Sequence, residues 1–455
     1  MSRRKLVLIG AGSAMFTKGL LVDIINNNQL GPWEIGLVDI DPEALLVAYN
    51  LAKKMINMKN VDIIVRKSTD RKELLPGADI VVTTIGVGGR KAWEKDVFIP
   101  RKYGIYQPVG DTVGPGGISR AMRMIPAMKD IAEDIIKLCP NALFFNYANP
   151  MTAICRALRK SVGADVIGLC IGVYEAEEHL AKILGVPHHE VTSIAIGINH
   201  LTFIIDFRYK GKDMFPIFKQ RLKEKCIEDF AKEKVKNDSP FSWLIKETSK
   251  NPFAWTLFNI YGAYPAPYDR HIVEFFPERF PNGKYYGKTL GVDIFSFEKT
   301  IESGELIYTE MTRLSRAETP LDEKIFSEPT GGEHSQILEI IDSIYMDRRK
   351  IFSVNLPNEG TISNLPPYAI LEMPAVATGT GFCPLHIRDF PDCLASIINK
   401  RLSCVELTVD AALKGDRKLM VEAMLADGAV KDQNIAEKLT DELLKAHKEF
   451  LPQFF

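Results

Sequence analysis

The first 170 residues alternate short apolar segments with amphipathic ones, and this alternation restricts the possible fold more than any other feature. Segments rich in Val, Ile, Leu and Phe are predicted strands at residues 5–9, 35–38, 62–65, 80–85, 143–146 and 166–169. Helix-like stretches lie between them, at residues 17–27, 42–58, 71–75, 119–138 and 151–161. Continuous apolar strands separated by helices are typical of a parallel sheet covered on both faces. We therefore predict a doubly wound α/β fold of the Rossmann type, with ligands bound beyond the carboxyl ends of the strands.

The alternation changes at about residue 191. Two further strands are predicted at residues 193–196 and 203–209, long polar helices at 217–236 and 298–314, and helices again at 390–450. Because no Gly/Ser linker or repeat interrupts the chain, we expect two packed domains, a Rossmann domain at 1–190 and a mixed α+β, helix-rich domain at 191–455. Such a layout is that of lactate and malate dehydrogenases.

Composition excludes several classes of protein. The formal net charge is −1 and no long basic run is present, so a nucleic-acid partner is not expected. No window approaches the ~18–20 apolar residues that span a bilayer, and residues 1–5 do not begin a signal peptide. The cysteines are scattered, at positions 139, 155, 170, 226, 383, 393 and 404. They suit reduced thiols, and we expect a cytoplasmic protein.

A glycine-rich turn follows the first predicted strand and precedes a helix. It contains Gly10, Gly12, Ser13 and Phe16, and such a turn lets a pyrophosphate approach the backbone at the helix N-terminus. The usual third glycine is replaced by methionine. However, the second strand ends at Asp39, whose carboxylate would accept ribose hydroxyls and repel a 2′-phosphate. The pattern predicts a dinucleotide site that favours NAD over NADP.

Residues after two later strands are expected to line the same dinucleotide site. Gly86 and Gly88 follow the fourth strand and permit close approach to the cofactor, while the neighbouring Arg90 is a candidate substrate contact. The fifth strand ends with Asn146 and Asn149, which could hydrogen-bond the nicotinamide, the ribose or a sugar hydroxyl. Both asparagines are equally compatible with a simple turn, since Asn149 is also a plausible N-cap.

A thiol and an imidazole each follow a later strand. Cys170 closes the sixth strand, and His200 lies in Gly-Ile-Asn-His after another apolar strand. The pair could share a divalent cation, with substrate oxygens completing the coordination. The competing interpretation is a buried apolar cysteine and an ordinary loop histidine.

Polar side chains crowd between prolines at residues 264–277. In this stretch Asp269 and Tyr268 are candidate general bases, and Arg270 and His271 are candidate contacts to an anion or a hydroxyl. Asp111, in a glycine-rich loop before the long helix, either faces the same cleft or only shapes the turn.

Together these motifs resemble glycoside hydrolase family 4, whose members depend on NAD and a divalent metal. The resemblance rests on their order along nearly the whole chain: Gly-Ala-Gly-Ser at 10–13, Asp39, Gly-Asp at 110–111, Asn-Pro-Met at 149–151, Cys170, Gly-Ile-Asn-His at 197–200, Asp-Arg-His at 269–271 and Glu-Leu-Thr-Val-Asp-Ala-Ala-Leu at 406–413.

The resemblance implies a glycosidase that uses redox elimination. NAD would take a hydride from C3 of the sugar, and Mn²⁺ or another divalent cation held by Cys170 and His200 would polarise the resulting ketone. Asp269, or Tyr268 in its place, would remove the C2 proton. Elimination, water addition and re-reduction would complete the cycle, with Asp111 a candidate proton donor. Family members suggest a homodimer or homotetramer.

One residue departs from the family pattern. Position 171, after the predicted ligand cysteine, usually carries His, Asp or Asn, and here it is Ile171. The stretch around Asp269 is most similar to members acting on α-linked uronic acids or unphosphorylated hexoses, and Arg270 would suit a carboxylate.

Two alternative functions remain at this stage. A simple NAD-dependent 2-hydroxyacid dehydrogenase needs no metal and would leave about 150 C-terminal residues and the pair Cys170 and His200 unexplained. A non-catalytic NAD- or sugar-binding protein would bind the cofactor without turnover on any glycoside.

Overall fold

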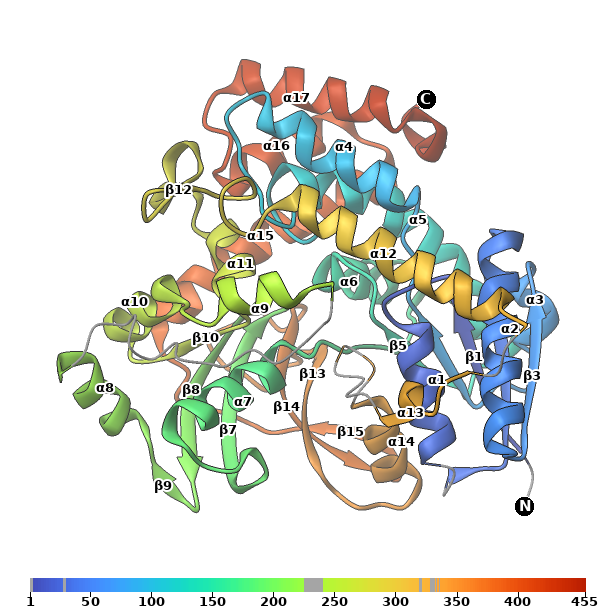
Figure 1. Cartoon of the computed structure of the whole chain (residues 1–455). Helices are drawn as coiled ribbons and strands as arrows, with labels where there is room; N and C mark the ends of the chain where they lie inside the picture. The colour runs from blue at the N-terminus through green and yellow to red at the C-terminus, as the bar shows by residue number, and fades with distance from the viewer. Residues whose placement is uncertain are drawn as a thin grey trace.

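Six parallel strands form one half of the main sheet, in the order β3-β2-β1-β4-β5-β6 (Figure 1). In this computed structural model the described residues are 3–27, 30–224, 240–318, 321–327, 332, 334 and 336–455. The strands are β1 (Arg4–Ile9), β2 (Trp33–Val38), β3 (Ile63–Ser68), β4 (Ile80–Thr83), β5 (Leu143–Asn146) and β6 (Val166–Gly168). This order is that of a Rossmann fold, which confirms the predicted fold class.

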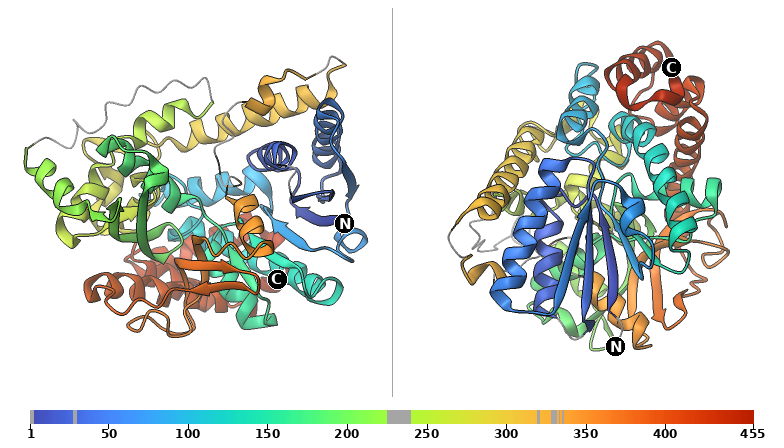
Figure 2. Two further views of the ribbon diagram at one scale, coloured as in Figure 1. Left: turned by 90° about the horizontal axis from the view of Figure 1, so that it is seen from below. Right: turned by 90° about the vertical axis from the view of Figure 1, so that its right-hand side faces the viewer.

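Both faces of the parallel half are covered by helices, as its apolar strands require. In β1, Leu6 and Leu8 face one hydrophobic core and Val7 and Ile9 face the other. The first core includes residues of α1 (Thr17–Asn26) and α2 (Pro42–Lys59), and the second includes α5 (Gly114–Leu138) and α6 (Met151–Val162). The right-hand view of Figure 2 shows the strands between these layers.

The sheet continues without a break into the second half of the chain. Beyond β6 come β13 (Ile351–Pro357), β14 (Ile370–Thr378), β7 (Val191–Ile198), β8 (Leu201–Tyr209) and β10 (Tyr264–Ala266). The predicted strands at 193–196 and 203–209 are confirmed within β7 and β8. The sheet therefore runs across the predicted domain boundary at residue 190 without interruption. The boundary itself stays a prediction.

Several helices differ from the prediction. The structure adds α4 (Gly89–Arg101) and α7 (Gly172–Leu184), and α5 begins within the predicted glycine-rich loop. This early start depends on close packing, since a Cβ on Gly117 would lie 2.3 Å from the Thr112 carbonyl carbon. The predicted helix at 217–236 begins as α8 (Phe215–Glu224), while its remainder and Cys226 lie outside the described residues.

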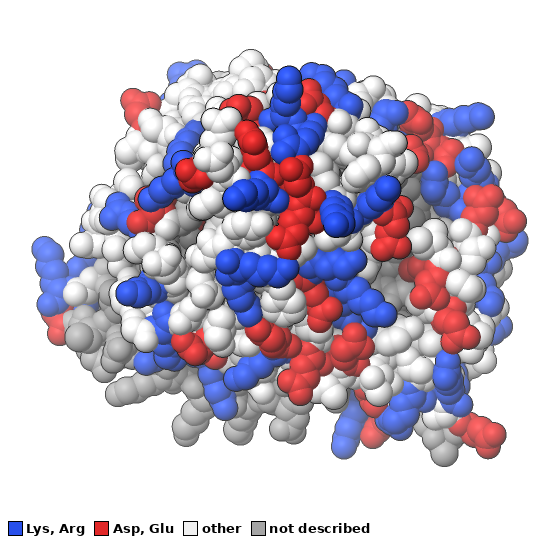
Figure 3. All heavy atoms as spheres, turned by 90° about the horizontal axis from the view of Figure 1, so that it is seen from above, with Lys and Arg blue, Asp and Glu red and all other residues white. Residues whose placement is uncertain are grey.

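The C-terminal helices cover one side of the sheet. They are α15 (Asp392–Lys414), α16 (Arg417–Asp427) and α17 (Gln433–Ala446), and they pack against α4, α5 and α6 (Figure 1). Another long helix, α12 (Phe297–Arg316), crosses to α2. Basic and acidic side chains are interspersed on the face shown in Figure 3. Within the described residues, no helix has both the length and the apolar character needed to cross a bilayer.

Candidate active site

The glycine turn after β1 brings three strand ends together. Gly10 has φ +94°, and a Cβ there would lie 2.8 Å from the carbonyl carbon of Thr84, which follows β4. Gly12 donates its backbone N–H to Oδ2 of Asp39, which follows β2, over 2.7 Å. A Cβ on Gly12 would lie 2.8 Å from the same oxygen. Both glycines are thus required by the approach of neighbouring strand ends.

The first turn of α1 is open to an anion. It has no acidic side chain and no side-chain cap, so the backbone N–H groups that follow Thr17 can face a ligand phosphate. Ser13 accepts a hydrogen bond from the Thr17 N–H through its carbonyl, and Phe16 is buried against Tyr147 with ring centroids 4.6 Å apart. Phe16 therefore stabilises the turn by packing in the hydrophobic core.

The glycines after β4 lie at the same edge. Gly86 is exposed, and a Cβ on it would lie 3.5 Å from Nη2 of Arg120. Gly88 has φ +79° and precedes α4. These positions are compatible with the predicted cofactor contacts.

Asn146 has a different role from the one predicted. Its side chain is fully buried and holds the turn after β5: Nδ2 donates to the Ala148 carbonyl, and Oδ1 accepts from the Ala148 N–H and the Thr83 hydroxyl, each over 3.0 Å. Both lone pairs of Oδ1 are used inside the protein, and the second Nδ2 proton faces the sulfur of Cys155 at 4.0 Å. Contact with a cofactor is therefore not available to Asn146.

Three candidate metal ligands converge from three separate segments. Asp111, His200 and His271 each offer one ligand atom, and these atoms all lie within 4.8 Å of one another. Asp111 lies in the loop before α5, His200 in the turn between β7 and β8, and His271 in the short helix α11 (Asp269–Ile272). The His200 and His271 rings are 4.3 Å apart between centroids. We refer to these three residues as the ligand cluster.

Thr112 fixes the orientation of His200. Its hydroxyl donates to Oδ1 of Asp111 over 2.7 Å and lies 2.8 Å from Nδ1 of His200. Because the hydroxyl has one proton, which Asp111 accepts, Nδ1 of His200 is the donor in the second contact. This leaves the lone pair on Nε2, the arrangement of a metal-ligating histidine oriented by its other nitrogen.

The surroundings favour neutral imidazoles. Burial lowers the pKa of His200, with Asp111 raising it and Arg270 lowering it. Burial also lowers the pKa of His271 well below its usual range, and His200 and Arg270 add to the effect. A neutral imidazole is the form that binds a cation.

Unsatisfied amide groups lie beside the ligand cluster. Asn149 Nδ2 donates to Oδ2 of Asp111 over 3.0 Å, but Asn149 Oδ1 is buried without a hydrogen-bond partner among the described residues. Asn199 is fully buried, and neither end of its amide has a partner in the described part of the chain. Leaving such groups unsatisfied costs about 1–3 kcal/mol each, so a polar ligand would be stabilised here.

Cys170 is not a member of the ligand cluster. Its sulfur lies 3.4 Å from the Gly172 backbone nitrogen at the start of α7, and Ile171 precedes this helix. Tyr268 lies near the same helix, with its hydroxyl donating to the Glu175 carbonyl over 3.5 Å. Cys170 as a ligand and Tyr268 as a base stay predictions.

Asp269 does not offer a carboxylate to the cleft. Its side chain is fully buried and accepts from the backbone N–H groups of Phe253 and Ala254, each over 2.8 Å, and from the Tyr285 hydroxyl over 2.6 Å. Burial raises its pKa to about 6, while these three donors lower it. The three donors occupy the carboxylate inside the fold, which corrects its expected role as the base that removes a substrate proton.

The two candidate arginines differ in position. Arg270 is half-buried, donates to the Thr300 hydroxyl over 3.1 Å and interacts electrostatically with Asp111. Arg90 instead pairs with Glu305 of α12 over 2.5 Å and lies over the Tyr308 ring. Arg270 is thus beside the ligand cluster, whereas Arg90 joins α4 to α12.

Sequence reasoning missed three residues that the fold brings to the site. They are Thr112, Glu274 and Arg120, which donates through Nε to the Asn149 carbonyl over 3.0 Å. Thr112 follows a predicted site residue and Glu274 lies in the polar stretch after Asp269, so both had a local signal. Arg120 lies within a helix and had none.

A Rossmann sheet with its glycine turn, together with the ligand cluster, defines a dinucleotide-binding class of protein with a candidate cation centre. Residues 5–186 match the family model described as "Family 4 glycosyl hydrolase", and residues 195–430 match its "C-terminal domain". The chain therefore belongs to family 4 of the glycosyl hydrolases, which confirms the resemblance seen in the sequence and the prediction of a glycosidase.

Relatives extend over the whole chain. An alpha-galactosidase of Bacillus subtilis is 29% identical, covering 99% of this chain and 100% of its own. An alpha-galacturonidase of Thermoanaerobacterium saccharolyticum is 32% identical, covering 97% and 95%. A solved 6-phospho-alpha-glucosidase from gut microorganisms, in complex with NAD and Mn²⁺, matches with TM-score 0.85 and 19% identity over 100% of both chains.

Proposed function

We propose that this family 4 enzyme cleaves α-linked hexosides or hexuronides, with NAD and a divalent cation as cofactors. The observation that carries the proposal is the ligand cluster of Asp111, His200 and His271. Contacts link it to the turn after β4: Asp111 accepts from Asn149, the Asn149 carbonyl accepts from Arg120, and Gly86 lies beside the Arg120 guanidinium. A dehydrogenase of the 2-hydroxyacid type has no use for such a cluster.

The residues at the strand ends fit NAD. Gly10, Gly12 and the open first turn of α1 suit a pyrophosphate, and the half-buried Asp39 carboxylate retains lone pairs for ribose hydroxyls. When bound, NAD supplies a reversible hydride acceptor, and the cation supplies a Lewis acid.

The cation would be held by Nε2 of His200, an imidazole nitrogen of His271 and a carboxylate oxygen of Asp111. Two imidazoles and one carboxylate are a common donor set for first-row divalent metals such as Mn²⁺. Cys170 remains a further candidate ligand from the sequence. This set includes no donor from Ile171, so it is complete without the side chain that the family usually carries at that position.

The remaining residues orient the sugar and move protons. Oδ1 of Asn149 and the amide of Asn199, which have no hydrogen-bond partner among the described residues, suit sugar hydroxyls, and Arg270 suits a carboxylate at C6. With Asp269 occupied, we assign removal of the C2 proton to Tyr268, the alternative expected from the sequence. Because Asp111 accepts two hydrogen bonds and would bind the cation as a carboxylate, we assign it to the cation, and its expected role as proton donor to the leaving group stays a prediction.

The position of Arg270 is the reason that we favour hexuronides over hexosides as substrates. A guanidinium beside the ligand cluster would recognise a uronic acid through a charge-assisted pair. Relatives named alpha-galacturonidase support this choice. The predicted cytoplasmic location and homodimeric or homotetrameric assembly stay predictions.

The experiment is a panel of aryl α-hexosides and α-hexuronides, assayed in D₂O with NAD and Mn²⁺ under reducing conditions. We expect deuterium at C2 of the released sugar and no net consumption of NAD. Hydrolysis that leaves protium at C2 would refute the proton-abstraction route. NAD binding without turnover on any glycoside would instead favour a non-catalytic binding protein, and stoichiometric NADH formation a dehydrogenase.

A further inference from the structure

The loop that carries Asp111 and Thr112, residues 107–114, is fixed by polar contacts at several points. Glu274 accepts the Val109 N–H over 2.6 Å and the Gly110 N–H over 2.9 Å. Glu274 lies three residues beyond His271. The loop is therefore tied to the segment that supplies the third member of the ligand cluster.

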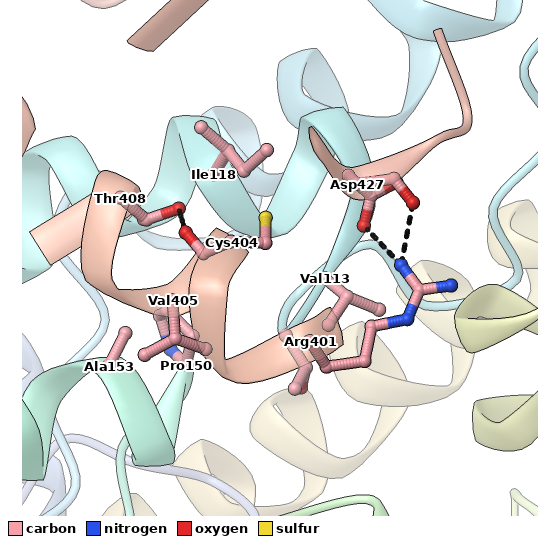
Figure 4. Close-up of a pocket in the computed structure, with 10 residues that line it drawn as sticks. Val113, Ile118, Pro150, Ala153, Arg401, Cys404, Val405, Thr408 and Asp427 are labelled. Atoms are coloured by element: carbon pink, nitrogen blue, oxygen red, sulfur yellow. Dashed lines mark hydrogen bonds and ion pairs between the residues drawn. The ribbon is translucent and has the colours of Figure 1, made fainter. Parts of the chain in front are cut away.

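A buried ion pair in the C-terminal helices makes a second connection between the same two segments. Arg401 of α15 and Asp427 of α16 meet with Nη1 and Oδ2 3.1 Å apart, and their side chains are 3% and 0% exposed. Nη1 also donates to the Asp427 carbonyl over 2.7 Å. Figure 4 shows the guanidinium directed at this carboxylate.

Each member of the pair reaches one segment of the site. Oδ2 of Asp427 accepts the Gly114 N–H over 3.1 Å, three residues beyond Asp111. Nη2 of Arg401 donates to the Phe275 carbonyl, four residues beyond His271. One ion pair thus spans the two segments that hold Asp111 and His271.

Stability alone is a poor explanation for this pair. Desolvation offsets most of the attraction in a buried ion pair, and apolar residues of similar volume often give equal stability. Moreover, a cavity of about 20 Å³ lies beside the pair, lined by Thr112, Val113 and Pro150 among others (Figure 4). The contacts that the pair makes at Gly114 and Phe275 are directional hydrogen bonds, so they place the loop more specifically than an apolar pair of similar volume would.

We propose that Arg401 and Asp427 are positioning residues that set the separation of Asp111 and His271, and thereby the affinity of the site for its cation. The pair lies outside the ligand cluster and acts through its contacts with Gly114 and Phe275. The inference rests on the proposed function, because it assigns a cation to the ligand cluster.

The test measures Mn²⁺ binding to the full-length protein by electron paramagnetic resonance, with NAD binding and thermal unfolding measured in parallel. For Arg401→Met we expect Mn²⁺ affinity to fall at least about tenfold, as for other residues that orient metal ligands, while NAD affinity stays unchanged. The control is Arg417→Met, which breaks the exposed pair Arg417 and Asp441 between α16 and α17. That variant should bind Mn²⁺ as the wild type does.

Unchanged Mn²⁺ affinity in Arg401→Met, accompanied only by a lower unfolding temperature, would overturn the inference. Should that variant fail to fold, Asp427→Asn, which keeps the shape of the side chain, decides the matter. Weaker Mn²⁺ binding in Asp427→Asn supports the inference, and wild-type binding refutes it. If the wild-type protein binds no Mn²⁺, the proposed function itself fails and this inference with it.

Discussion

Two segments of the site, residues 107–114 and 264–276, look alike in sequence but use their aspartates differently. Each contains an aspartate beside glycines or prolines, and the sequence made both candidates for proton transfer. Asp111 is half-buried and lies in the ligand cluster, whereas Asp269 is fully buried beneath three hydrogen-bond donors.

The difference shows that the hydrogen-bond donors around a carboxylate determine whether it holds the fold or is available for chemistry. Asp269 receives the first two N–H groups of α10 (Pro252–Tyr261) and the Tyr285 hydroxyl, so it anchors a helix start and a loop. Asp111 receives two side-chain donors, of which Thr112 also contacts His200. The first aspartate holds the fold, and the second can serve chemistry.

The largest loss of activity is expected for His200→Asn, which removes an imidazole ligand of the cation. Loss of a Lewis acid costs several kcal/mol of transition-state stabilisation, so glycosidase activity should fall at least about a thousandfold. Steady-state assay with saturating NAD and Mn²⁺ measures this. His189→Asn, at an exposed position, is the control and should retain activity. Equal activity in both variants would remove His200 from the site.

Asp111→Asn should have the next largest effect, about a hundredfold or more on kcat, as expected for loss of a negatively charged ligand that holds the Lewis-acid cation. The amide keeps the shape of the side chain, so the thermal unfolding temperature should change little. Asp130→Asn, exposed on α5, provides the comparison. Should Asp111→Asn retain wild-type kcat, the loop would have no chemical role and the contrast with Asp269 would disappear.

Asp269→Asn tests the other half of the comparison, the structural role of Asp269. Replacing a carboxylate that accepts three hydrogen bonds should lower the free energy of unfolding by about 1–3 kcal/mol. The folded variant should still exchange the C2 proton of a bound sugar at close to the wild-type rate. Urea unfolding and isotope exchange followed by NMR measure the two effects. Loss of exchange with unchanged stability would restore Asp269 as the base.

Tyr285→Phe should give the smallest effect, a loss of about 1 kcal/mol in unfolding free energy, since it removes one of the three donors to Asp269. The adjacent Tyr286 is 60% exposed, so Tyr286→Phe is a matched control that should leave stability unchanged. Indistinguishable urea midpoints for the two variants would argue against the anchoring role of Asp269.

The parallel half of the fold followed from sequence because each of its signals is local. A strand, its glycine turn and the next helix are consecutive, so Gly10, Gly12 and Asp39 were found together. The helices α4 and α7 were missed, as were β13 and β14, which enter the sheet between β6 and β7 from the distant residues 351–378. Short apolar runs of that kind do not reveal which strand they join.

The site was less predictable for the same reason. His200 and Asp111 were selected, but their approach to His271 depends on three segments far apart in the chain. The hydrogen-bond donors to Asp269 come from residues 253, 254 and 285, which are too far away in the sequence for a local pattern to predict the contacts. Asn146 was misassigned because its partner Thr83 becomes apparent only when β4 and β5 pair, although the contact to Ala148 is local.

The most direct test of the account is pulsed electron paramagnetic resonance of Mn²⁺ bound to the protein in the presence of NAD. We predict nitrogen hyperfine couplings from two imidazoles in the wild type and from one in His271→Asn. Nitrogen couplings that are absent, or that persist unaltered in His271→Asn, would contradict a cation held between His200 and His271.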